Sequence, residues 1–260
     1  MLSGTQLDGV ALVVGSGRGI GQQEAFSIAE AGARVIVFGD LNEENAKASA
    51  EESKEYASNK SYEATYFHVN VTDEKGVQAM VDFVERFGSL DYAVNAAGVD
   101  NGVHTPGAEI DIENYDRIMN INAKGTMLCV RAEAAAMRKQ TSKTFTSRNG
   151  TRDIGRGAIV IITSATSFAR LPGKGCYTIS KHAVMAICKM AGLGHAAEGV
   201  RCNANPKISG MINAIYPIKR AAECKEVEDT VVCLLSPSAS YITGTSLIID
   251  TGITTTVHLF

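Results

Sequence analysis

The sequence predicts an α/β fold in which a parallel sheet of about seven strands carries helices on both faces. Short apolar runs alternate along the chain with longer amphipathic stretches, which is typical of parallel strands joined by right-handed helical connections. A chain of 260 residues, 45% hydrophobic and 20% charged, is long enough for one domain with a sizeable core. No internal repeat indicates a second unit, so we expect residues 1–260 to form a single domain.

Each element is predicted from its local pattern, because short apolar runs favour buried strands and amphipathic stretches favour helices. Strands are expected at 10–14, 34–38, 65–69, 91–94, 158–163, 200–204 and 246–249. Helices are expected near 20–31, 43–57, 74–87, 112–138, 176–197 and 226–235. Ligands of such a doubly wound sheet bind beyond the carboxyl ends of the strands.

The first strand, Val10–Val14, runs directly into a glycine-rich turn with glycines at Gly15, Gly19 and Gly21. Glycine permits a tight turn from strand to helix, and the following helix N-terminus offers free N–H groups and a partial positive charge. A glycine-rich surface loop is the alternative, but a second strand that ends at Asp40 favours a nucleotide site. The expected phosphate contacts are Gly15, Ser16, Gly17, Arg18, Gly19, Ile20 and Gly21.

Tyr177 and Lys181 are four residues apart in a helical pattern, so the ammonium can lie beside the phenol. A free tyrosine has a pKa of about 10 and transfers protons poorly near neutral pH. A positive charge about 4 Å away, at an effective dielectric of about 20, favours the phenolate by roughly 4 kcal/mol, or about three pKa units. We therefore expect Lys181 to bring the pKa of Tyr177 into the range of efficient acid–base catalysis.

Together these motifs resemble the short-chain dehydrogenase/reductase family over nearly the whole chain. The motifs that carry the resemblance are the glycine turn, Asn95-Ala96-Ala97-Gly98, Asn122, Ser164, Tyr177 and Lys181. The Ser/Thr/Arg-rich insertion between Arg138 and Arg156 is similar to those of fungal members. The resemblance implies a Rossmann-type domain, a nicotinamide cofactor and an oxidoreductase.

The resemblance also implies a role for each residue of a catalytic tetrad. Tyr177 would protonate the carbonyl oxygen as hydride arrives, or take the alcohol proton in the reverse direction. Lys181 would lower the pKa of that tyrosine and bind the nicotinamide ribose. Ser164 would hydrogen-bond the reacting oxygen, and Asn122 would hold a water that links the lysine to solvent.

The expected cofactor is NAD, with NADP as the alternative. Asp40 could bond the adenosine ribose, and it would repel the 2′-phosphate of NADP by up to about 4 kcal/mol before screening. Arg18 could instead pair with that phosphate, and most relatives carry the acid one position earlier, at Gly39. The further expected contacts are Leu41, Asn70, Val71, Asn95, Ala96, Ala97, Gly98, Tyr177, Lys181, Pro206 and Ile208. For Asn70 and Val71 the alternatives are a strand-end cap and a core residue.

Three departures from the family pattern affect the nicotinamide end of the site. Pro206 is followed by Lys207 instead of glycine, and the threonine that contacts the carboxamide has no clear counterpart around 208–211. The substrate-covering lid is also shortened, because only about ten residues separate Pro206 from Pro217. A short lid predicts a site that is open, slow, suited to a bulky substrate or covered by another chain.

The sequence therefore predicts an enzyme that acts on a secondary alcohol or ketone, with a bulky or cyclic metabolite as its substrate. The short lid and Lys207 leave open an isomerase or cyclase that uses bound nucleotide as a scaffold. A nucleotide-sensing protein is a third reading, against which the complete tetrad argues, because a binding module needs no tuned tyrosine.

Charge and composition bear on the partners. A net charge of −3 and the absence of a membrane-length apolar run argue against nucleic acid and membrane partners. The six cysteines contain no CxxC pair, which favours a reducing cytoplasm and gives no metal site. The resemblance implies a homodimer or homotetramer built through the helices at 112–138 and 176–197.

Overall fold

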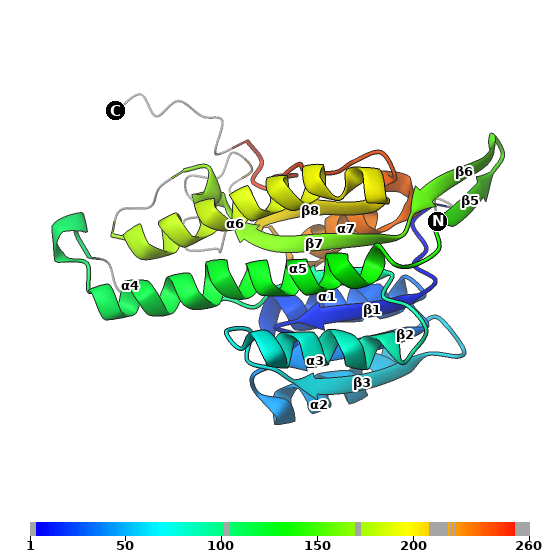
Figure 1. The fold of residues 1–260 in the computed structure, drawn as a ribbon, viewed down its shortest axis with the longest axis horizontal. Coiled ribbons are helices and arrows are strands. Elements are labelled where there is room, and N and C mark those ends of the chain that lie inside the picture. Colours follow the sequence, from blue (N-terminus) through cyan, green and yellow to red (C-terminus); the bar gives the residue numbers. More distant parts are fainter. Residues whose placement is uncertain are drawn as a thin grey trace.

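A computed structural model describes residues 4–100, 105–169, 173–207, 218, 220 and 222–252. In these residues a parallel sheet has the strand order β3-β2-β1-β4-β7-β8 (Figure 1). Its strands are β1 (Val10–Val14), β2 (Val35–Asp40), β3 (Glu63–His68), β4 (Tyr92–Asn95), β7 (Gly157–Ser164) and β8 (Val200–Lys207). The order reverses between β1 and β4, and this reversal creates the crevice where ligands of doubly wound sheets bind.

Helices cover both faces of the sheet, as predicted. They are α1 (Gly19–Glu30), α2 (Glu43–Glu52), α3 (Glu74–Glu85), α4 (Ile112–Met119), α5 (Thr126–Met137), α6 (Gly175–Gly194) and α7 (Cys224–Leu235). Side chains of a strand alternate between faces, so Leu12 packs in the core with α3, α5 and α6, and Val13 packs with α1, α2 and α7. None of the helices described is long and apolar enough to cross a membrane.

The predicted strand at 246–249 does not form a ladder. Among the described pairs, Ser246 bridges β8 at Ala204, where Ala204 N donates to Thr245 O (2.9 Å) and Leu247 N donates to Ala204 O (3.1 Å). Side chains also bond this edge, because Cys202 N donates to Thr243 Oγ1 (3.1 Å) and Thr245 N donates to Asn203 Oδ1 (3.3 Å). The segment therefore follows the edge of β8 as an extended chain, and the described sheet has six strands.

The polar insertion forms an antiparallel hairpin of β5 (Lys143–Ser147) and β6 (Gly150–Gly155), which projects beyond the amino end of β7 (Figure 1). Lys143 pairs with the buried Asp91 (2.6 Å), and Arg152 donates to the carbonyl of Pro237 (2.9 Å). These two contacts fix the hairpin to the body.

The long helix predicted at 112–138 is not a regular α-helix. A π-helical segment, Asn120–Gly125, joins α4 to α5. Such segments widen the backbone locally and are frequent at functional sites. This one contains Asn122, the residue that the resemblance singles out.

Candidate active site

The glycine turn is tied to the end of β2 and to the loop after β4. Gly15 N and Ser16 N both donate to the carbonyl of Gly39, at 2.7 and 3.3 Å. Gly15 has φ +84°, and a Cβ atom there would lie 2.5 Å from the backbone nitrogen of Ala97. A Cβ at Gly21 would collide with the carbonyl oxygen of Gly15. Only glycine therefore allows the turn to pack this closely.

The N-terminus of α1 suits an anion. The helix begins at Gly19, where an added Cβ would meet nothing within 4 Å. Arg18 occupies the N-cap position without a side-chain capping bond, and the first turn of this described helix has no acidic side chain. Free backbone N–H groups and the helix dipole at an open position fit the pyrophosphate of a dinucleotide.

Asp40 is held beside the glycine turn. Its Oδ2 accepts from Gly17 N (2.8 Å) and its Oδ1 accepts from Asn42 N (2.9 Å). Gly39, one position earlier, faces the core, where an added Cβ would lie 2.8 Å from the Met80 sulfur. The neighbouring Leu41 is 64% exposed, so a fixed carboxylate and an apolar surface lie together at the end of β2, where the adenosine of the expected cofactor would bind.

The side chains of Asn70 and Val71 contact other residues of the protein. Asn70 Oδ1 accepts from Thr72 N (3.0 Å) and Thr72 Oγ1 (2.9 Å), which closes a turn after β3. Val71 packs in the core against the π-helical segment, where a Cβ at Gly125 would lie 2.7 Å from its Cγ2. These contacts are those of a strand-end cap and a core residue, and the cofactor contacts expected of Asn70 and Val71 stay predictions.

The loop Asn95–Gly98 leaves the end of β4 and meets a buried acid. Asn95 Nδ2 donates to Glu133 Oε2 (2.8 Å), on α5. Both residues are buried, and burial raises the pKa of Glu133 to about 7, against a lowering effect of the hydrogen bond from Asn95. The sequence analysis missed Glu133, although it is an isolated acid in the apolar run 126–137, which is a usable signal.

Asn122 joins this loop to α6. Its Oδ1 accepts from Val99 N, and its Nδ2 donates to Val99 O, both at 2.8 Å. Nδ2 also donates to Ser180 Oγ (3.0 Å), so the side-chain amide is occupied by protein groups. Its backbone carbonyl accepts from Thr126 Oγ1 (2.7 Å). The water expected at Asn122 stays a prediction.

Lys181 is 6% exposed, and burial lowers its pKa to about 8. Its Nζ donates to the carbonyl of Ile162 in β7 (3.2 Å). A Cβ placed at Gly98 would lie 3.6 Å from this nitrogen and 3.3 Å from Asn122 Oδ1. The loop after β4, the π-helical segment and α6 thus converge on one point.

Tyr177 meets Ser164 at the carboxyl end of β7. Burial and the charge of Asp100 raise the pKa of Tyr177, and a side-chain hydrogen bond with Ser164 lowers it. The predicted lowering by Lys181 is not found. Lys181 is not among the groups that shift the pKa of Tyr177, and its ammonium lies 5.7 Å from the centroid of the phenol ring.

The remaining predicted contacts lie around the end of β8. Pro206 pairs with Thr163 of β7, and Lys207 pairs with Ser164. Ile208 and the segment interpreted as a shortened lid lie outside the described residues.

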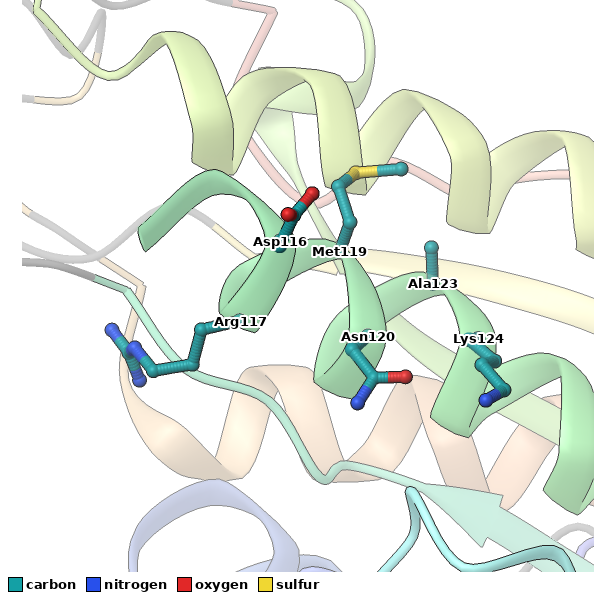
Figure 2. Close-up of a pocket in the computed structure, with 6 residues that line it drawn as sticks. All are labelled: Asp116, Arg117, Met119, Asn120, Ala123 and Lys124. Carbon is teal, nitrogen blue, oxygen red and sulfur yellow. The ribbon is translucent and has the colours of Figure 1, made fainter. Parts of the chain in front are cut away.

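A surface groove of about 590 Å³ lies apart from these residues (Figure 2). It is lined by Asp116, Arg117, Met119, Asn120, Ala123 and Lys124. Figure 2 shows Met119 and Ala123 pointing toward α6, while Arg117 and Lys124 point away from it. None of the tetrad residues lines this groove, so it is not where the predicted chemistry would occur.

Comparisons with known proteins identify the family of this chain. A family model described as short chain dehydrogenase matches residues 9–207, and one described as enoyl-(acyl carrier protein) reductase matches residues 204–254. The short-chain dehydrogenase anuF of Penicillium roqueforti is 36% identical over 97% of this chain and 98% of its own length. A 2,5-dichloro-2,5-cyclohexadiene-1,4-diol dehydrogenase of Sphingobium indicum is 30% identical over 94% of this chain and 96% of its own.

Solved structures show the same fold. A gluconate 5-dehydrogenase from Burkholderia cenocepacia in complex with NADP and tartrate superposes with a TM-score of 0.83. It is 27% identical, over 98% of this chain and 99% of that one.

Proposed function

The chain belongs to the short-chain dehydrogenase family and is an NAD(P)-dependent oxidoreductase, and from this premise we propose that it interconverts a ketone and a secondary alcohol. The proposed catalytic residues are Asn122, Ser164, Tyr177 and Lys181. The observation that carries the proposal is the convergence of Tyr177 and the buried Lys181, whose ammonium lies 5.7 Å from the centroid of the phenol ring, bonds Ile162 at the end of β7 and lies beside Gly98.

In the proposed reaction the nicotinamide ring supplies the hydride when the cofactor is bound. Tyr177 donates its hydroxyl proton to the carbonyl oxygen, and Ser164 donates a hydrogen bond that orients the same oxygen. Lys181 binds the nicotinamide ribose and offsets the charge that develops on the phenolate. Burial raises the pKa of Tyr177, so the phenol holds the proton that this step requires.

We favour NAD over NADP as the cofactor. The carboxylate of Asp40 is fixed beside the glycine turn by two backbone N–H groups, where it would repel a 2′-phosphate. Arg18 is exposed in the same turn and is the residue that would accommodate the phosphate instead. The structural neighbour with NADP bound keeps this second outcome open.

A bulky or cyclic metabolite is the proposed substrate class. Support comes from the short interval between Pro206 and Pro217 and from the cyclic diol named for the Sphingobium relative. The direct test is an absorbance assay at the reduced-nicotinamide band, with NADH and NADPH and a panel of cyclic ketones and secondary alcohols. Turnover of no member of the panel with either cofactor would contradict the proposal.

We propose that residues 1–260 fold as one domain that assembles as a homodimer or homotetramer in the cytoplasm. Apolar residues exposed on α6 support the assembly, with Met190 59% and Leu193 83% exposed. The groove in Figure 2 lies on α4 and the π-helical segment, within the region 112–138 that the resemblance implies for assembly. Light scattering that shows only a 27.5 kDa monomer at micromolar concentration would contradict the assembly.

A further inference from the structure

Asn205 is a buried amide whose hydrogen-bonding groups are unused. It lies near the carboxyl end of β8, and its side chain is 0% exposed. Neither Oδ1 nor Nδ2 has a hydrogen-bond partner among the described residues. A buried donor or acceptor without a partner destabilises the folded state, so keeping this amide lowers the stability of the fold.

Asn203 shows that the same strand face can satisfy a buried asparagine. It is two residues earlier, so its side chain points to the same face, and it is also 0% exposed. Its Nδ2 donates to the carbonyl of Ile242 (2.8 Å), and its Oδ1 accepts from Thr245 N (3.3 Å). The two residues therefore differ in position along the strand, and only the one nearer the ligand-binding edge lacks partners.

The sheet register places Asn205 beside the proposed catalytic residues. Asn205 pairs with Ile162 of β7, whose carbonyl accepts the hydrogen bond from Lys181 Nζ. Ser164 lies two residues further along the same strand. Ile162 packs in the core that contains α1 and α7, so Asn205 points to the face of the sheet from which the glycine turn and α1 come. Lys181 approaches from the opposite face, on α6.

We propose that Asn205 binds the carboxamide group of the nicotinamide ring, an inference that rests on the proposed function. The carboxamide carries one carbonyl and one NH₂ group, as the asparagine side chain does. The two amides can therefore pair through two hydrogen bonds, each NH₂ donating to the other carbonyl. This pairing gives Oδ1 and Nδ2 of Asn205 one partner each. It also holds the nicotinamide ring in one orientation about its glycosidic bond.

The test compares two ligands that share the adenosine end and differ in the nicotinamide. NADH and ADP-ribose are titrated calorimetrically into the parent protein, Asn205→Leu and Asn203→Leu. Asn205→Leu removes both hydrogen bonds at similar volume, so NADH should bind about tenfold more weakly or worse, with ADP-ribose unchanged. Its melting temperature should stay the same or rise, because an unpaired buried amide is removed.

Asn203→Leu is the matched control. Because it breaks two hydrogen bonds of the fold, it should lower the melting temperature and leave the ratio of the two affinities unchanged. An Asn205→Leu protein in which NADH and ADP-ribose weaken equally, or neither weakens, overturns the inference and assigns the amide to internal packing or buried water.

A measurement on the parent alone keeps the inference testable if the leucine variant does not fold. Reduced 3-acetylpyridine adenine dinucleotide keeps the ring carbonyl but replaces NH₂ by a methyl group. The parent should bind it several-fold more weakly than NADH, and equal binding overturns the inference. Failure of the proposed function looks different, because the parent would then gain no affinity from the nicotinamide and would turn over no substrate.

Discussion

The two ends of the proposed cofactor site satisfy their polar groups in different ways. At the adenosine end, Asp40 accepts from two backbone N–H groups, and Gly39 receives two donors from the glycine turn. At the catalytic end, the buried ammonium of Lys181 has one backbone acceptor, and the buried polar atoms of Thr163 and Asn205 have no partner among the described residues. At the adenosine end the polar groups are paired within the protein, whereas at the catalytic end several of them can still bond a ligand.

This difference indicates that the catalytic end lowers the stability of the fold. Buried charges and unpaired polar groups are unfavourable, and they persist at sites whose function requires them. We therefore expect variants at the catalytic end to change chemistry or stability without affecting adenosine binding. Variants at the adenosine end should change the affinity of every adenosine ligand.

The largest expected effect is on turnover, in Tyr177→Phe. The change removes only the hydroxyl, so turnover should fall about 10²–10⁴-fold while ADP-ribose affinity and the melting temperature are kept. Steady-state assays and calorimetry on the same preparation measure both quantities. If turnover stays within about tenfold of the parent, the tyrosine is not the proton donor and the catalytic end has been wrongly located.

Lys181→Met should abolish most activity and stabilise the fold at neutral pH. Burial lowers the pKa of Lys181 to about 8, against about 10.4 when unfolded, so the buried charge costs about 3 kcal/mol below pH 8. The parent should gain stability as pH rises from about 8 to 10.4, because the folded lysine loses its proton first. Urea unfolding at pH 7 and pH 10 tests this, and the advantage of the variant should shrink at the higher pH.

Glu133→Gln should change how stability depends on pH. Burial raises the pKa of Glu133 to about 7, so the folded parent binds a proton that the unfolded chain has lost above about pH 4.5. The parent should lose up to about 3 kcal/mol between pH 4.5 and 7, and the glutamine variant should not. Glu228→Gln, at a buried acid bonded to Ser27 Oγ (2.7 Å), is the control. Equal pH profiles for parent and Glu133→Gln would contradict the prediction.

Asp40→Ala should have the smallest effect, on cofactor preference. Loss of a partly exposed carboxylate removes about 1 kcal/mol of screened repulsion, so a preference for NADH over NADPH should fall about tenfold or less. NADH and ADP-ribose should weaken together in this variant. If only the affinity for NADH falls in this variant, the proposed difference between the two ends is wrong. If the parent protein binds NADPH more tightly than NADH, Arg18 is the partner of the 2′-phosphate.

The parts of the molecule that follow local patterns were predictable from the sequence. Apolar runs located the six strands within a few residues, and the glycine turn and Asn95–Gly98 were expected at the strand ends where they lie. The spacing of Tyr177 and Lys181 also placed their side chains on one helix face. These features depend on contacts within a few residues of the chain.

Features that depend on tertiary burial were not predictable in the same way. Burial raises the pKa of Tyr177 more than Ser164 lowers it. The spacing of residues along the sequence does not reveal how deeply a side chain is buried. The unpaired amide of Asn205 depends on what surrounds β8. The segment 246–249 meets β8 at one bridge, at Ser246, and does not extend it into a ladder. The π-helical segment has no pattern that separates it from an α-helix.

The β5–β6 hairpin offers a position at which a sequence can be inserted into the chain. It leaves the body at the amino ends of the strands, whereas the proposed chemistry lies at their carboxyl ends (Figure 1). Its tip, Arg148 and Asn149, is exposed, and the hairpin is fixed to the body at its other end through Lys143 and Arg152. Exposed loop tips of this kind tolerate inserted sequence. A fluorescent reporter or an affinity tag inserted between Arg148 and Asn149 should label the enzyme without lowering its activity.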